Sequence, residues 1–100
     1  FPYWVQLLVG GYDSAPRLYS LDALGSVLEE KVVSTGSGSP FAYGLLEQDY
    51  KEGKAVEEML PVAAKAVKSA VSRDAYSGNN INLVAITKKG YTEIDAKKYL

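Results

Sequence analysis

The chain has 100 residues, 47% of them hydrophobic and 23% charged, a balance that excludes intrinsic disorder and fits one small domain. The formal net charge is −1 and no basic stripe is present, while the absence of cysteine and histidine excludes disulfides, thiolate nucleophiles, and imidazole-based metal sites or triads. No apolar run reaches the roughly 18 residues that a membrane span needs. We therefore expect no nucleic-acid or membrane partner, and the lack of cysteine suits a reducing cytoplasm.

The first third of the chain predicts three strands in a meander. Residues 3–9 are apolar on both faces, as in a strand buried between two layers. Turn residues follow at 10–11 and 13–16, residues 17–22 alternate as a second strand, and residues 27–33 indicate a third. Because domain ends are usually polar, an apolar strand so close to residue 1 favours the expectation that a preceding segment is missing.

Two helices are predicted in the middle of the chain. Ser39 and Pro40 carry helix-start chemistry, a hydroxyl that can cap free amides and a proline that the first turn tolerates. Pro61 either kinks the second helix or marks its start. The second helix has an alanine-rich apolar stripe and a charged outer face. The stripe consists of Val56, Met59, Leu60, Ala63, Ala64, Val67, Ala70 and Val71, and the outer face of Glu57, Glu58, Lys65 and Lys68.

Two further strands are predicted at residues 81–87 and 91–94. Strands grouped apart from helices indicate an α+β fold, with an antiparallel sheet covered by a helical layer. The first strand and the strand at 81–87 are apolar on both faces and need cover on two sides. We therefore expect the other face of the sheet to meet a second sheet that this chain does not contain.

The loop Gly36-Ser37-Gly38 lies between a predicted strand and a predicted helix, where backbone amides and the helix dipole can bind an anion. It does not match a nucleotide-binding pattern, because the third glycine of G-x-G-x-x-G would fall at Phe41. A tight turn capped by Ser39 is the structural alternative.

A second polar group, Arg73-Asp74-Ala75-Tyr76-Ser77-Gly78, follows the second helix. Gly78 is explained by helix termination. An Asp that bonds nearby amides is a common structural reason for placing Asp74 and Ser77 in one short turn. Local bonding and a functional role both stay open on these residues alone.

Two phrases of the sequence together resemble the proteasome β subunit: STGSGSPFAYGLLE at residues 34–47 and SRDAYSG at residues 72–78. Residues 3–11, YWVQLLVGG, are similar to archaeal β subunits in particular. The resemblance covers nearly the whole chain. It implies a four-layer αββα sandwich of the N-terminal nucleophile hydrolase class, of which residues 1–100 form the C-terminal half of a single β-type domain.

The resemblance also implies an activity and partners. A proteasome β subunit is a threonine-type endopeptidase that degrades unfolded proteins to peptides. Its N-terminal Thr hydroxyl attacks the peptide carbonyl, and its own α-amine acts through water as general base. The implied setting is cytoplasmic, in stacked heptameric rings of β and α subunits, with no cofactor and no metal.

The resemblance assigns roles to residues position by position. Ser37 resembles the serine beside the nucleophile's amine, and Asp74 and Ser77 resemble the pair that orients this amine and the catalytic water. Asp22 lies where related subunits offer an acidic residue to a neighbouring subunit's substrate pocket. The nucleophilic Thr, its Lys and its first acidic partner would lie upstream of Phe1, so we expect the 100 residues alone to be inactive.

Other readings remain. A non-catalytic structural proteasome subunit would share the fold, although α-type subunits lack the Arg-Asp-x-x-Ser-Gly turn. A small stand-alone binding module is a further alternative, against which the uncovered sheet face counts. Thr35 and Thr92 are not predicted as nucleophiles, because neither has a free α-amine and no histidine can serve as base. Most tyrosines are expected to fill the core.

Overall fold

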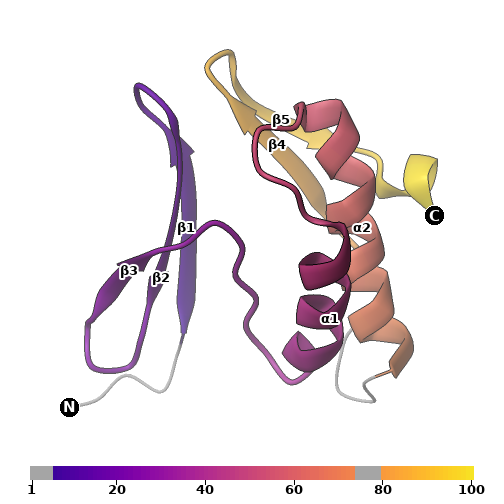
Figure 1. Ribbon diagram of the computed structural model, residues 1–100, viewed down its shortest axis with the longest axis horizontal. Coiled ribbons are helices and arrows are strands. Elements are labelled where there is room, and N and C mark those ends of the chain that lie inside the picture. The colour runs from indigo at the N-terminus through magenta and orange to yellow at the C-terminus, as the bar shows by residue number, and fades with distance from the viewer. Residues whose placement is uncertain (1–5, 74–79) are drawn as a thin grey trace.

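The computed structural model describes residues 6–73 and 80–100. The element order confirms the expected sequence of three strands, two helices and two strands, with a short 3-10 helix added at the end (Figure 1). The elements are β1 (Leu7–Tyr12), β2 (Pro16–Leu21), β3 (Val27–Glu29), α1 (Ser39–Asp49), α2 (Val56–Arg73), β4 (Leu83–Thr87), β5 (Gly90–Ile94) and η1 (Ala96–Tyr99). Helix and strand are mixed, as an α+β chain requires.

The strands pair antiparallel in two sheets, β1-β2-β3 and β4-β5. The prediction of a turn at residues 10–11 is wrong, because Gly10 and Gly11 belong to β1 and face Leu18 and Arg17 of β2. A Cβ at Gly10 would lie 3.7 Å from Ile86 Cδ1 of β4, so the glycine lies where the hairpin β4-β5 approaches β1. The turn comes at residues 13–15, where the Asp13 carboxylate accepts backbone N–H bonds from the next two residues.

The third strand is shorter than predicted. It ends at Glu29, whereas residues 27–33 were expected to be extended. Glu30 still donates its backbone N–H to the carbonyl of Leu18 at 2.8 Å, and the chain then leaves the sheet for the helices. Lys31 forms an ion pair with Glu52 in the loop between α1 and α2, at 2.7 Å. The residues after Glu29 therefore connect the two layers.

The helix starts differ in part from the prediction. The N-cap of α1 is Gly38, and no side chain caps the helix, so the predicted cap by Ser39 is wrong. Ser39 is instead the first helical residue, followed by Pro40 as expected. Pro61 lies inside α2 and does not mark its start. Its missing N–H removes one backbone hydrogen bond of the second turn.

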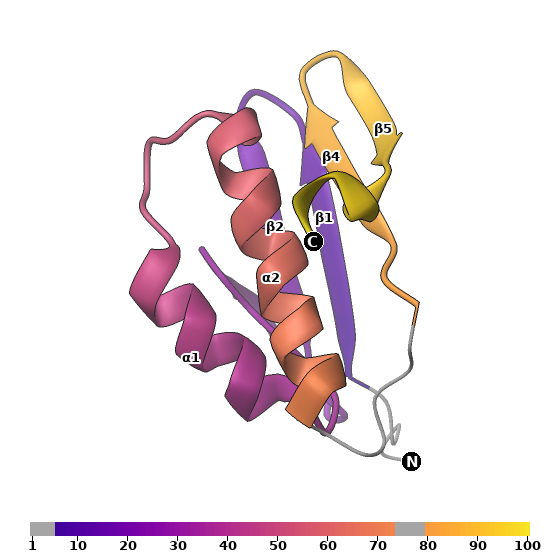
Figure 2. The ribbon, with the colours of Figure 1, turned by 90° about the vertical axis from the view of Figure 1, so that its right-hand side faces the viewer.

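The buried core lies between α2, β4 and η1. It is formed by Ala64, Leu83 and Ala96, with half-buried Leu60 and Ile94 packed against it. The helices lie side by side in front of the strands (Figure 2), and small alanines allow this close approach. The charged outer face of α2 is exposed as predicted, whereas buried Ala66 was not foreseen in the apolar stripe.

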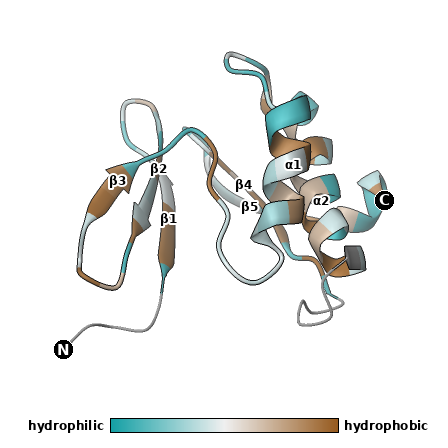
Figure 3. Ribbon diagram, turned by 60° about the horizontal axis from the view of Figure 1, so that its bottom comes forward, coloured by the Kyte–Doolittle hydropathy of each residue, from teal (hydrophilic) through white to brown (hydrophobic). Residues whose placement is uncertain are grey.

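The first sheet carries exposed apolar side chains. Leu7 is 54% exposed, Val9 49% and Leu28 60%, and hydrophobic residues follow β1 and β3 in Figure 3. In the part of the chain that the structure describes, no large side chain is fully buried. The register places Leu28 on the face of Leu8, opposite that of Leu7 and Val9, so apolar side chains are exposed on both faces of this sheet. The expectation of a second sheet as cover stays a prediction. The four-layer sandwich itself stays a prediction.

Candidate functional site

The loop at residues 34–38 connects the segment after β3 to the start of α1. Gly36 has φ +101°, a backbone conformation that side chains with a Cβ rarely adopt. The carbonyl of Gly36 accepts the backbone N–H of Ser39 at 3.1 Å, and the carbonyl of Gly38 accepts that of Phe41 at 3.1 Å. The glycines thus turn the chain sharply into α1 and present Ser37 at the start of the helix.

This loop lines a cavity of about 320 Å³ together with the last part of α2. Ser37 lines this cavity together with Val71 in α2 and with Asn80. In Figure 2 the start of α1 and the end of α2 lie at the same end of the helix pair. The predicted site residues Asp74 and Ser77 lie outside the described residues, but the residues that precede and follow their segment share one cavity with Ser37.

The chemistry of the cavity is limited to neutral polar groups. Its described lining offers the hydroxyls of Ser34, Thr35 and Ser37 and the amide of Asn80, with no carboxylate or amine. Neutral hydroxyls and amides can hold a ligand or orient a proton carrier, but they do not remove a proton near neutral pH. The described part of the site therefore fits a supporting role, and any base must come from elsewhere.

Two threonines were excluded as nucleophiles on the sequence. Thr35 donates its hydroxyl to Gln6 Oε1 at 2.8 Å, so this hydroxyl makes a structural bond. Thr92 lies on β5, paired with Ala85 of β4. We therefore still expect Thr35 and Thr92 not to act as nucleophiles.

Asp22 lies apart from the Ser37 cavity, in the turn between β2 and β3. Its Oδ1 accepts the backbone N–H groups of Ser26 and Leu24, each at 2.9 Å. These bonds, with Ser26 contributing most, lower the pKa of Asp22 below its usual range, so the carboxylate is charged at neutral pH. Leu24 projects from this turn and is 85% exposed. The role predicted for Asp22 toward a neighbouring subunit stays a prediction.

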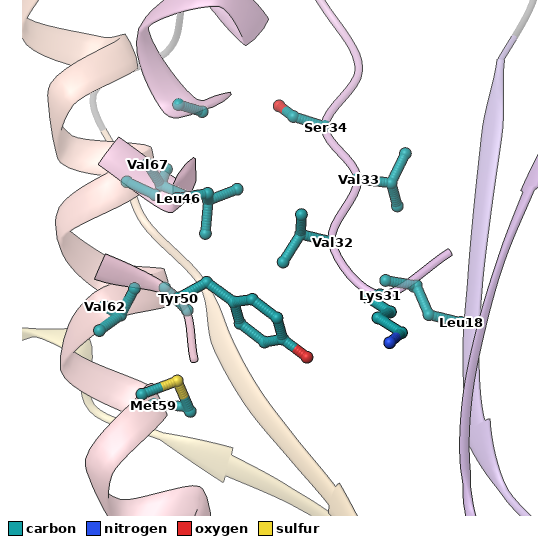
Figure 4. A pocket seen from close by; sticks show the side chains of 13 residues that line it. Leu18, Lys31, Val32, Val33, Ser34, Leu46, Tyr50, Met59, Val62 and Val67 are labelled. Carbon is teal, nitrogen blue, oxygen red and sulfur yellow. The ribbon is translucent and has the colours of Figure 1, made fainter. Parts of the chain in front are cut away.

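A second, apolar cavity of about 310 Å³ separates the helices from the first sheet (Figure 4). Tyr50 and Met59 reach into it from the helix side, and Leu18 and Val33 line the opposite side. Lys31 also lines this cavity, and its ion pair with Glu52 raises the pKa of the lysine, chiefly through the hydrogen bond. The cavity marks a gap between two layers that do not pack tightly.

Two side chains that hold the Ser37 loop carry no signal in the sequence. Tyr43 accepts the backbone N–H of Ser34 at 2.8 Å, and Gln6 accepts the hydroxyl of Thr35. Tyr43 was read as core, in line with the other tyrosines, and it is half-buried. Spacing along the chain gives no signal for a bond between residues 6 and 35.

Within residues 6–73 and 80–100, no group of three acidic or other metal-ligating side chains could hold a metal ion. In the same described ranges, the helices are too short or too polar to cross a membrane.

The element order and the loop at the start of α1 define a chain of mixed helices and strands with a cavity lined by hydroxyl side chains. The family described as proteasome subunit matches residues 1–86. The chain therefore belongs to the proteasome subunit family, and the resemblance to proteasome β subunits is confirmed.

Three relatives illustrate the match. Proteasome subunit beta 2 of Aeropyrum pernix is 57% identical over 93 residues, covering 93% of this chain and 42% of that protein. Proteasome subunit beta of Methanocaldococcus vulcanius is 53% identical over 93 residues, covering 90% and 42%. Proteasome subunit beta 1 of Thermococcus gammatolerans is 48% identical over 94 residues, covering 94% and 47%. The chain thus spans less than half the length of these relatives.

Proposed function

We propose that these residues belong to a catalytic β subunit of the proteasome core particle, a threonine-type endopeptidase that degrades unfolded proteins to peptides. The chain would supply the C-terminal half of one β-type domain in a four-layer αββα sandwich. It would work in the cytoplasm, in stacked heptameric rings with other β and α subunits. Membership of the proteasome subunit family and the identity to β subunits support this proposal.

One observation carries the catalytic assignment. Ser37 shares a cavity with Val71 and Asn80, which lie on either side of the segment that contains Asp74 and Ser77. The packing of α1 against α2 brings the flanks of this segment to the cavity that the Gly-Ser-Gly loop also lines. Side chains of both loops can therefore contribute to one site, as the proposed roles require.

The proposed roles are those that the resemblance to proteasome β subunits implies. An N-terminal Thr, in a part of the subunit beyond these 100 residues, attacks the peptide carbonyl, and its hydroxyl proton passes through water to its own α-amine. The peptide's amine leaves with a proton, and water then hydrolyses the acyl-enzyme ester. Ser37 would bond the α-amine, and Asp74 with Ser77 would orient that amine and the water.

The test uses a complete β subunit that carries these residues, assembled with α subunits. Asp74→Asn should leave ring assembly intact and lower kcat for a fluorogenic peptide by about 10² or more, because an amide cannot carry the charge. Ser77→Ala acts on the same network. The loss of kcat in the double variant Asp74→Asn with Ser77→Ala should therefore be much smaller than the product of the two single losses. Asp49→Asn, at the end of α1, is the matched control.

Two results would count against the proposal. Rings of the unmodified subunit that cut no peptide would favour the non-catalytic structural subunit. Rings of Asp74→Asn that cut at near-normal rates would mean that the turn only ends a helix.

A further inference from the structure

The Ser37 loop is tied to its own helix by a tyrosine hydroxyl. Tyr43 lies in the second turn of α1 and is half-buried. Its hydroxyl oxygen accepts the backbone N–H of Ser34 at 2.8 Å, a contact that is partly buried. The bond spans nine residues and closes over the whole turn from Ser34 to the start of the helix.

Two further contacts hold the same end of the loop. The hydroxyl of Ser34 donates to Ser39 Oγ at 3.2 Å, and Thr35 donates to Gln6 Oε1 at 2.8 Å. Both residues that precede Gly36 are therefore fixed by side chains from other elements. The loop is anchored before its glycines and again where α1 begins.

Between these anchors the backbone turns through Gly36 and Gly38, whose carbonyls accept the N–H groups of Ser39 and Phe41, each at 3.1 Å. Ser37 stands between two glycines, and Gly38 is an N-cap without a side-chain bond to the helix. Glycine leaves the backbone more freedom than any other residue. The anchors set the two ends of this turn and so contribute to where the Ser37 hydroxyl lies.

We propose that Tyr43 is a positioning residue for Ser37, an inference that rests on the function proposed above. Its hydroxyl fixes Ser34, and through Ser34 it fixes the distance between the Ser37 hydroxyl and the group that this serine bonds. Tyr43 touches neither substrate nor the reacting atoms in this scheme. Its effect is on the geometry of the reacting groups, to which rates are steeply sensitive.

Tyr43→Phe in assembled rings of a complete β subunit tests this directly, because phenylalanine keeps the ring and removes only the acceptor. We expect kcat for a fluorogenic peptide to fall about tenfold, with KM within about twofold and normal ring assembly. In the double variant that combines Tyr43→Phe with Ser37→Ala, kcat should fall no further than in Ser37→Ala alone. The reason is that the hydroxyl that Tyr43 positions is already absent. Tyr50→Phe, at the other end of α1, is the matched control and should be near normal.

The outcomes separate this inference from the proposed function. Normal kinetics of Tyr43→Phe beside a severe loss in Ser37→Ala would overturn the role of Tyr43 and leave the proposed function standing. A loss in Tyr43→Phe that adds fully to that of Ser37→Ala, or that Tyr50→Phe reproduces, would also overturn it. If Tyr43→Phe rings do not form, the Tyr43 hydroxyl is needed for folding or assembly, and the positioning role is rejected. Normal activity of Ser37→Ala would refute the role proposed for Ser37 and with it that of Tyr43. Unmodified rings that cut no peptide would refute the proposed function itself.

Discussion

Expressed by itself, the 100-residue chain should not form a stable monomer, and the size of the deficit follows from its exposed surface. The chain exposes 7466 Å², whereas a folded monomer of 10.8 kDa exposes about 5,500 Å² by the usual scaling with mass. If about half of the excess of roughly 1,900 Å² is apolar, its burial would be worth about 24 kcal/mol at 25 cal/mol per Å². This exceeds the whole stability of a typical domain, about 5–15 kcal/mol.

The assay is thermal unfolding of the purified chain, followed by near-ultraviolet circular dichroism, with the mass in solution measured by sedimentation. We expect association or a non-cooperative melt, with binding of a hydrophobic dye, because Leu7, Val9 and Leu28 stay exposed. A monomer with fixed aromatic signals and a sharp transition would refute the reasoning. It would also favour the stand-alone module over a part of a larger domain.

Three further predictions concern a complete subunit that carries these residues. Gly36→Ala should lower the free energy of unfolding by about 1–2 kcal/mol in thermal unfolding, because φ is +101° at this position. Gly44→Ala inside α1 should raise it by about 0.5–1 kcal/mol. Equal effects of the two variants would contradict the backbone strain assigned to Gly36. Leu83→Ala in the core should cost about 2–5 kcal/mol by urea unfolding, and a cost below 1 kcal/mol would mean that this core is not packed as described. The N–H bonds from Ser26 and its turn lower the folded-state pKa of Asp22, so its contribution to stability is present above about pH 4 and is lost as the pH falls through the folded-state value. The amide chemical shift of Ser26 should therefore titrate below pH 4, and a midpoint at or above that of an unfolded peptide would refute the bond.

Local sequence patterns predicted the order of elements because each pattern has a local cause. Alternation of apolar residues, proline at the start of α1 and the charged outer face of α2 are all properties of neighbouring residues. The predictions that were wrong concern residues whose structure depends on contacts far along the chain. Gly10 and Gly11 look like a turn in sequence, but they pair with β2 where β4 comes close. Residues 30–33 look like a strand, but they must cross to the helical layer.

The candidate site divides in the same way. Ser37 could be singled out because Gly-Ser-Gly before a proline marks a loop entering a helix. Its meeting with Val71 and Asn80 needed the packing of α1 against α2. The bond from Ser34 to Tyr43 could not be foreseen, because a half-buried tyrosine in a helix usually fills space and its hydroxyl partner depends on the path of the loop.

Stability and site geometry are linked through Gln6. This residue directly precedes β1, the strand whose apolar side chains remain exposed, and it accepts the hydroxyl of Thr35 in the Ser37 loop. Tyr43 anchors the same loop from α1, which contacts α2 closely but is separated from the first sheet by an apolar cavity. The two anchors therefore belong to layers that are not packed tightly against each other. The loop is thus bonded to both layers, so a change in the separation of the layers would strain the bond from Thr35 to Gln6 or the bond from Ser34 to Tyr43.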